Sequence, residues 1–140
     1  MGIPIELITN QYVMPRYVGD DPTLYNAILM ANVDTVSRDI TVTIGETAVN
    51  ETFTLAPAES KYVYYLGVVG GPIVVSSDVG AKIIASLYEL KRGAAGTGYN
   101  GQSEMNGLPF GLLSDTYLIP IYFGDPVHSG LDARLFIAVP

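Results

Sequence analysis

The sequence predicts an all-β protein built from antiparallel strands. Short runs that are apolar or alternate between apolar and polar residues are separated by links rich in glycine and proline. A helix also fits residues 81–91, and a helical turn fits residues 26–33. Of the 140 residues, 49% are hydrophobic and only 15% are charged. This composition is the opposite of that of disordered chains, so we expect a folded domain with a real core.

Two segments show the alternation of half-buried strands most clearly. Residues 38–44 place Ile40, Val42 and Ile44 between threonines, and residues 51–55 alternate again after a short polar link, which predicts a hairpin. The other expected strands are short apolar or aromatic runs bounded by turn residues, at residues 26–33, 61–66 and 73–77.

The segment from residue 81 to residue 91 fits two patterns. Its apolar residues have a helical spacing, but the alternation from Ile84 to Leu90 fits a strand, and we expect a strand because every neighbouring segment is one. Residues 92–103 contain four glycines and no periodicity, which predicts a flexible connection.

A stretch of nineteen residues occurs twice, and it defines the organisation of the chain. Residues 2–20 match residues 107–125 at a constant distance of 105 positions, with eight identical pairs that include Gly2/Gly107 and Pro4/Pro109. This period has the size of a small domain. We therefore expect one module at residues 1–103 and a partial second copy at residues 104–140. Residues 132–139 (DARLFIAV) also resemble residues 26–33 (NAILMANV), so the extension repeats the first two strands.

Five motifs carry a resemblance to a known group of proteins. They are TVTIG (41–45), TLAPAES (54–60), GGPIVVSS (70–77), IIASL (83–87) and SEMNGLP (103–109). Over nearly its whole length the chain resembles tandem extracellular modules of large surface proteins in filamentous, often thermophilic bacteria such as Chloroflexi. The resemblance implies an immunoglobulin-like antiparallel β-sandwich, with about seven to nine strands here, located outside the cell or on its surface.

Composition excludes several functions. The net charge is −7 and the seven Lys and Arg residues are scattered, which argues against binding to nucleic acid or to an anionic membrane. We find no apolar run near the ~18 residues of a membrane span, and without cysteine there is neither a disulfide nor a thiolate metal site. The single histidine, His128, lies in a turn-rich stretch, and no Ser nucleophile has a motif around it. We expect neither an enzyme nor a cofactor.

Acidic residues recur in equivalent loops of the two copies. Asp20, Asp21 and Asn26 in the first copy, with Asp125 and Asp132 in the second, offer the oxygen ligands that calcium prefers. The favoured alternative is an Asx turn, in which the Asp side chain accepts backbone N–H bonds.

Two further features suggest surface chemistry. Asn50-Glu51-Thr52 is a glycan acceptor triplet in the expected hairpin loop. Ten tyrosines, with Tyr62 and Tyr64 on one face of a strand and Tyr65 beside them, suggest stacking on sugar rings, although core packing explains them equally well. Carbohydrate is therefore a candidate partner.

The incomplete second copy leads to the main functional expectation. Its apolar strands lack the rest of a module, and unpaired strand edges invite pairing with another chain. We expect a structural subunit of an extracellular filament or cell-surface stalk that assembles head to tail with copies of itself. A longer covalent tandem array is the rival within this class, and a carbohydrate-binding or adhesin module is the alternative from another class.

Two sets of residues would serve this assembly. Pro4, Tyr12, Pro15 and Tyr17 would start each module, with the prolines fixing the path of the chain and the tyrosines packing the joint. The expected contacts with a neighbouring copy are Tyr117, Leu118, Ile119, Pro120, Ile121, Tyr122, Phe123, Leu135, Phe136, Ile137 and Val139.

Overall fold

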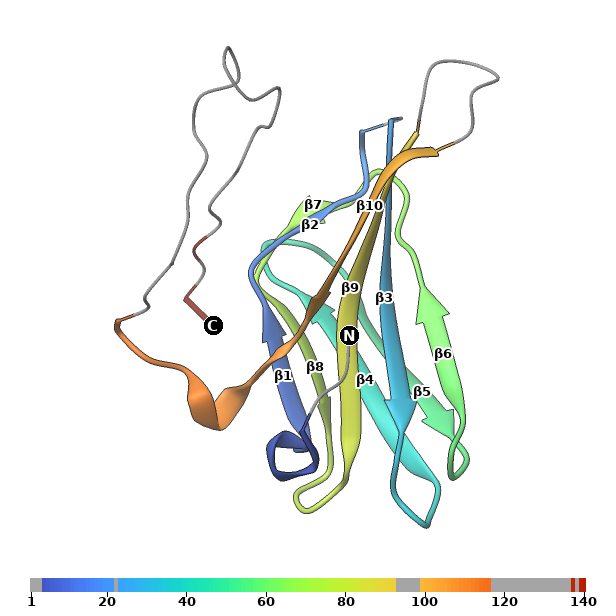
Figure 1. Cartoon of the computed structure of the whole chain (residues 1–140), viewed down its shortest axis with the longest axis vertical. Coiled ribbons are helices and arrows are strands. Elements are labelled where there is room, and N and C mark those ends of the chain that lie inside the picture. The colour runs from blue at the N-terminus through green and yellow to red at the C-terminus, as the bar shows by residue number, and fades with distance from the viewer. Residues whose placement is uncertain (1–3, 22, 93–98, 117–136, 138) are drawn as a thin grey trace.

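A computed structural model describes the chain at residues 4–21, 23–92, 99–116, 137 and 139–140. Within these residues it is an antiparallel β-sandwich with eleven strands, eight of them four residues or longer, and two single-turn 3-10 helices (Figure 1). The predicted all-β antiparallel sandwich is confirmed.

Two sheets form the layers of the sandwich. In spatial order, the first sheet contains β10 (Tyr99–Asn106), β9 (Ile83–Arg92), β3 (Leu24–Asn32) and β6 (Ser60–Val63). The second contains β11 (Leu108–Pro109), β1 (Gln11–Met14), β8 (Ile73–Ser77), β4 (Arg38–Ile44) and β5 (Asn50–Leu55). The short strands β2 (Tyr17–Val18) and β7 (Val69–Gly70) pair at one end of the sandwich (Figure 1).

The core lies between the sheets and follows the alternation in the sequence. In β4 the inward residues Ile40, Val42 and Ile44 are almost completely buried, while the threonines between them are half-buried on the other face. The remaining core side chains come from both sheets and from β2, and they are Tyr12, Met14, Tyr17, Ile28, Met30, Leu55, Val63, Ile73, Val75, Ile83 and Ala85.

Most of the expected strands are present. β4 and β8 have the predicted bounds, and β4 forms the predicted hairpin with β5, from Arg38 opposite Leu55 to Thr43 opposite Asn50. The segment with two interpretations is strand β9, which pairs with β3 on one side and β10 on the other. These two partners fix its conformation, because a helix would leave both edges unpaired.

Two predictions about local structure were wrong. Residues 92–103 do not form a loop throughout, since β10 begins at Tyr99 and pairs with β9. The proposed boundary between residues 103 and 104 therefore falls inside a strand. The expected strand at 61–66 ends earlier, because β6 stops at Val63, and Tyr64 is not part of it.

The expected strands of the second copy lie mostly outside the described residues. Of the residues proposed to contact a neighbouring copy, the structure describes Ile137 and Val139, and both are exposed. Tyr117–Phe123, Leu135 and Phe136 are not among the described residues, nor are Asp125, His128 and Asp132.

Candidate functional site

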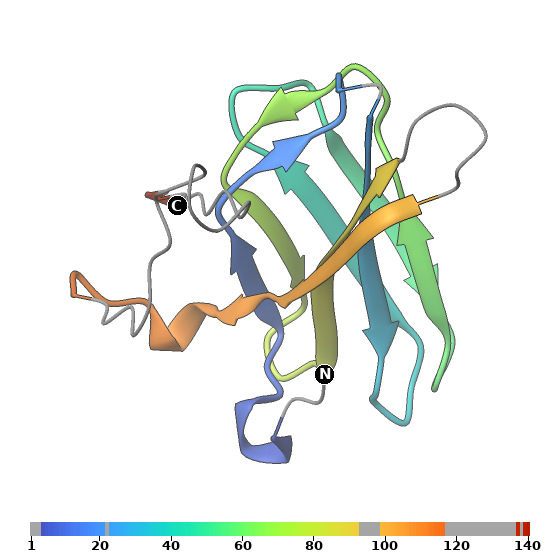
Figure 2. The same cartoon turned by 45° about the horizontal axis from the view of Figure 1, so that its top comes forward.

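The second copy of the repeated stretch starts on the edge of the first module. After β10 the chain crosses to the second sheet, where Leu108 lies opposite Val13 and Pro109 opposite Tyr12 in the short pairing of β11 with β1. The helix η2 (Phe110–Leu112) follows at once, and Figure 2 shows it beyond the body of the sandwich. Residues 107–109 therefore belong both to the described sandwich and to the stretch that is repeated in the sequence.

Gly107 makes the crossing between the sheets. Its N–H donates to the carbonyl oxygen of Ala85 at 2.8 Å, which ties the crossing to β9. A Cβ atom at this position would lie 2.8 Å from the Cβ of Tyr12 and 3.1 Å from the carbonyl oxygen of Ala85. Both atoms are held by the fold, so the close approach requires glycine. The close packing of residue 107 against Tyr12 and Ala85 is thus a physical reason for the glycine at position 107.

Tyr12 joins the start of the module to its end. Its ring is fully buried, and its hydroxyl donates to the carbonyl oxygen of Leu7 at 3.3 Å and accepts the N–H of Thr9 at 3.2 Å. The Cβ side of the same residue faces Gly107. Burial raises the pKa of the Tyr12 hydroxyl, and the Thr9 N–H partly opposes this shift. One side chain therefore contacts both the opening segment and the crossing.

The short helical turn that follows the first proline of the repeat has the same backbone geometry in both copies. The helix η1 (Ile5–Leu7) is preceded by Pro4 at φ −54° and ψ 140°, and η2 by Pro109 at φ −52° and ψ 132°. In both copies the next backbone N–H bonds back to the first residue of the turn. Over residues 4–8 and 109–113 the sequence match is therefore also a match of backbone conformation.

Tyr17 and Pro15 lie away from the crossing at Gly107, since Tyr17 is in β2 and the Pro15 carbonyl lies beside Gly71, just after β7. The Tyr17 hydroxyl donates to the carbonyl oxygen of Asn26 at 2.9 Å and accepts the N–H of Tyr65 at 2.7 Å, and its ring meets that of Tyr65 edge to face at 5.9 Å. Burial raises the pKa values of both tyrosines, and the nearby Glu51 carboxylate adds to the shift of Tyr65. The four predicted module-start residues are thus not gathered in one place: Pro4 and Tyr12 lie at the joint, and Tyr17 anchors β2.

The acidic loop has the geometry of an Asx turn. Asp21 accepts hydrogen bonds from the backbone N–H and the hydroxyl of Thr23, each at 2.7 Å, while Asp20 is exposed. Asn26 is buried, and its amide donates to the carbonyl oxygen of Val18. Among the described residues, no three or more His, Asp or Glu side chains are grouped so that they could hold a metal ion.

Asn50 begins a strand instead of lying in the hairpin loop. It is exposed at the start of β5, opposite Thr43. The hydroxyl of Thr52, the third residue of the acceptor triplet, is hydrogen-bonded to that of Thr41 at 2.8 Å.

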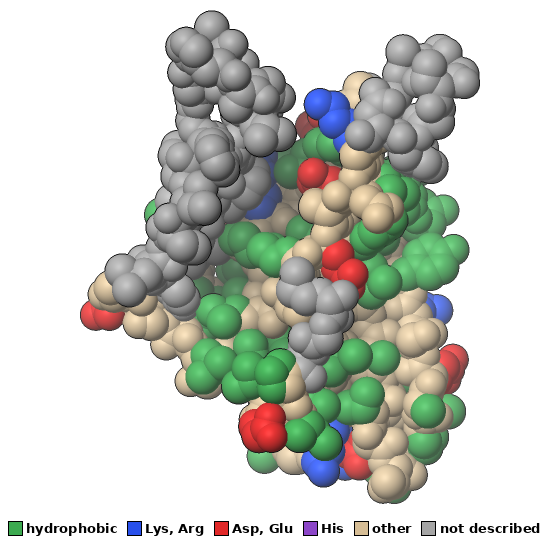
Figure 3. Space-filling model, in the orientation of Figure 1, with side chains coloured by type: hydrophobic (Ala, Val, Ile, Leu, Met, Phe, Trp, Pro, Cys, Tyr) green, Lys and Arg blue, Asp and Glu red, His purple; other side chains and the backbone are tan. Residues whose placement is uncertain are grey.

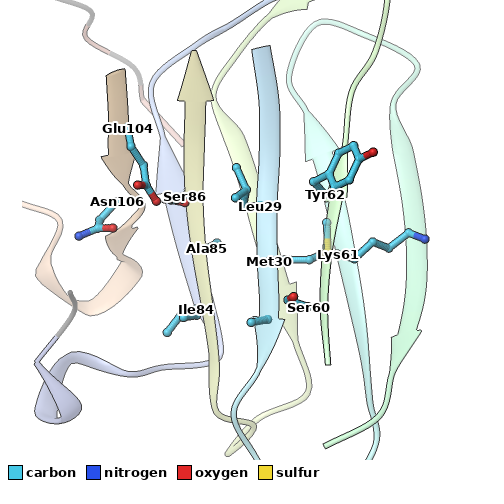
Figure 4. Close-up of a pocket in the computed structure, with 11 residues that line it drawn as sticks. Leu29, Met30, Ser60, Lys61, Tyr62, Ile84, Ala85, Ser86, Glu104 and Asn106 are labelled. Atoms are coloured by element: carbon cyan, nitrogen blue, oxygen red, sulfur yellow. Dashed lines mark hydrogen bonds between the residues drawn. The ribbon is translucent and has the colours of Figure 1, made fainter. Parts of the chain in front are cut away.

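A groove of about 360 Å³ crosses the outer face of the first sheet. Figure 4 shows Leu29 and Ile84 at its floor, Tyr62 on one side, and Glu104, Ser86 and Asn106 on the other. The Ser86 hydroxyl donates to the Glu104 carboxylate at 2.9 Å. Tyr62 is 63% exposed. Tyr64 does not line the groove; it is 50% exposed, and its ring centroid lies 5.6 Å from that of Tyr25. Hydrophobic side chains are visible over β3 and β6 on this face (Figure 3).

Asn32 is a buried polar residue that the sequence interpretation missed. Its amide nitrogen lies within hydrogen-bonding distance of the carbonyl oxygens of Val36, Leu55 and Ala56, at 2.8, 3.0 and 3.2 Å, and its side-chain oxygen accepts the N–H of Asp34 at 2.9 Å. The available signal was a single asparagine at the end of an apolar strand. Such a residue must find polar partners when it is buried.

No helix among the described residues is long and apolar enough to cross a membrane.

No protein-family model matches the chain. No curated protein matches it either. Among solved structures, the crystal structure of Thermotoga maritima 1070 is similar, with a TM-score of 0.51 and 14% sequence identity over 71% of this chain and 92% of that one. At this identity the similarity is one of fold alone: the chain shares a β fold with that protein.

Proposed function

We propose that the chain is a structural subunit of an extracellular filament or cell-surface stalk in which modules follow one another head to tail. The observation that carries the proposal is the repeated start: Pro109 and η2 reproduce the conformation of Pro4 and η1 at a distance of 105 residues. A second module would begin at the residue where the first one ends.

The connection has no linker, and this favours a structural role. Pro109 is the last residue of β11 and also the residue before η2, so no flexible segment separates the first module from the repeated turn. A flexible linker lets neighbouring modules take many orientations. A direct connection anchored on β1 restricts them, as a filament requires.

Two forms of this assembly remain under the proposal. In the first, residues 117–123 and 133–139 complete or contact a module of the neighbouring subunit, as in donor-strand complementation. In the second, the modules are joined covalently in a longer tandem array. The intact mass of the native polypeptide distinguishes these two forms. We assign the chain no catalytic role.

The test compares the full chain with a truncated chain of residues 1–116, which keeps β10, β11 and η2. We expect the full chain to form polymers in sedimentation velocity and negative-stain electron microscopy. The truncated chain should stay monomeric with the same circular dichroism. A truncated chain that polymerises as well as the full chain would contradict the proposal. A full chain that stays monomeric at millimolar concentration would contradict its non-covalent form.

The groove on the first sheet favours a second candidate function, a carbohydrate-binding or adhesin module. An exposed aromatic ring such as Tyr62 can stack on the apolar face of a sugar, while Glu104 and Asn106 supply groups that bind hydroxyls. The test is calorimetric titration with a neutral oligosaccharide such as cellohexaose. Binding lost in Tyr62→Ala but kept in Val69→Ala, an exposed residue away from the groove, would support it; absence of binding in the unaltered chain counts against it.

A further inference from the structure

Three segments meet at the end of the sandwich where the described chain starts, and we call this surface the η1 end. They are η1 with the residues leading to β1, the β3–β4 loop at 33–37, and the β8–β9 loop at 78–82. The N–H of Val33 donates to the carbonyl oxygen of Lys82 at 3.0 Å, and the N–H of Ile83 to that of Thr9 at 3.0 Å. Backbone hydrogen bonds therefore hold the three segments side by side.

The η1 end exposes apolar side chains from all three segments. Val79 is 97% exposed, Ile5 77%, Val36 51%, Val33 41% and Leu7 36%. In Figure 3 hydrophobic side chains gather around η1 at the lower end of the molecule. Such a concentration of exposed apolar side chains on loops is typical of an interaction surface.

The loops that carry these side chains are held in place. The Asn32 amide nitrogen donates to the carbonyl oxygen of Val36 at 2.8 Å and lies within hydrogen-bonding distance of those of Leu55 and Ala56, which ties the β3–β4 loop to β5. Asp34 in the same loop forms an ion pair with Arg38, the first residue of β4, at 2.6 Å. The β8–β9 loop is closed by the N–H of Ala81, which donates to the carbonyl oxygen of Asp78 at 3.0 Å. A surface held in this way loses little conformational entropy when it binds.

The repeat identifies the partner. Phe110 and Leu112 in η2 are 44% and 48% exposed, and they occupy the positions that correspond to Ile5 and Leu7. They follow β11 directly, and η2 contacts β1. In a module that begins at η2, the surface equivalent to the η1 end would therefore face the flank of the preceding module, which is formed by β1 and β11.

We propose that the η1 end docks against the β1–β11 flank of a second copy of this chain. The inference rests on the proposed head-to-tail arrangement and adds the two surfaces that meet in it. Burial of the apolar side chains of the η1 end would provide the hydrophobic contribution to each contact.

The chain contains no cysteine, so a single label can be placed at will. The variant Val79→Cys carries an environment-sensitive fluorophore at the η1 end. Leu66→Cys serves as the matched control, because Leu66 is 80% exposed and lies beside Gly67 and the β2–β7 pair at the other end of the sandwich (Figure 1). As the full chain assembles, we expect a blue shift of the label at position 79 and none at position 66.

A second measurement uses substitution instead of labelling. The double variant Ile5→Ser with Val79→Ser should weaken self-association at least about tenfold, since each substitution removes an apolar side chain from the contact. Leu66→Ser should leave association unchanged. If the full chain assembles but the label at position 79 stays exposed and the double variant assembles normally, this inference is wrong and the structural role stands. If the full chain does not assemble at all, this inference and the non-covalent form of the proposed function both fail.

Discussion

Replacing Gly107 with alanine tests whether the crossing between the sheets is as close as the structure describes. The new Cβ would lie 2.8 Å from the Cβ of Tyr12 and 3.1 Å from the carbonyl oxygen of Ala85, well inside normal contact distance. Neither atom is the tip of a flexible side chain: one is next to the backbone of a fully buried tyrosine, and the other is backbone in β9. The substitution therefore has to displace the crossing itself.

The expected cost follows from these contacts. Overpacking of a tight site costs roughly 1–3 kcal/mol, and the reduced freedom of the unfolded chain returns about 0.4–1 kcal/mol for Gly→Ala. We expect a net loss of about 1–2 kcal/mol in the free energy of unfolding. For a chain of this size the loss corresponds to a decrease of roughly 3–8 °C in Tm. Urea titration and differential scanning calorimetry measure both quantities.

Gly111→Ala is the matched control. Gly111 lies in η2, four residues after Gly107, and a Cβ there would meet no atom within 4 Å. We expect no loss of stability in this variant, and a small gain from the unfolded state. Equal Tm values for Gly107→Ala and Gly111→Ala would refute the reasoning. Faster hydrogen exchange at the residue 107 amide, which donates to Ala85, would locate the damage at the crossing.

Three further predictions concern stability. Tyr12→Phe removes the hydroxyl that bonds to Leu7 and Thr9, and it should lower the free energy of unfolding by about 1 kcal/mol. In the control Tyr88→Phe the lost hydroxyl reaches only an exposed Gln102 at 3.3 Å, so the loss should be less than about 0.5 kcal/mol. Urea titration compares the two variants. Asn32→Ala leaves buried carbonyl oxygens without their donor and should cost roughly 2–4 kcal/mol, seen as a lower denaturation midpoint at unchanged m-value. The pKa values of Tyr12 and Tyr17 are raised in the folded state, so the contribution of these hydroxyls to stability is complete below about pH 10 and is lost as the pH rises above it. Tm should therefore fall between about pH 10 and pH 12. The decrease should be smaller in Tyr17→Phe, which lacks one of the two groups.

Strands with a clear alternation were predictable from the sequence, and strands that depend on their partners were not. β4 alternates, and β8 begins with three β-branched apolar residues directly after a glycine-proline turn, so their own residues indicate where they lie. β10 contains mainly polar and glycine residues, with Met105 as its single apolar side chain apart from Tyr99. It is a strand because β9 offers it an edge, and this information lies in the tertiary structure.

The candidate joint was predictable in position but not in construction. The 105-residue period located both copies and selected Tyr12 and Pro4. Periodicity could not indicate that residues 107–109 would pair with β1, nor that Gly107 would contact Tyr12, because these contacts join residues about a hundred positions apart in the sequence. The sequence period also grouped Tyr17 with Tyr12. Periodicity could not indicate that Tyr17 would instead bond to Asn26 and Tyr65, away from Gly107.

The pairing of β11 with β1 determines how a tandem array would respond to pulling. The chain enters the module through β1 and leaves it through β11, and these strands are neighbours. Tension along the array would therefore pass through their two-residue ladder, through the hydrogen bond from Gly107 to Ala85, and through the bonds that hold Thr9 and Asn10 to β9 and β8. Rupture of the β11–β1 ladder and of the Gly107 bond would release β11 and lengthen the connection while the other strands of both sheets stay paired, so the connection would yield before the sandwich unfolds.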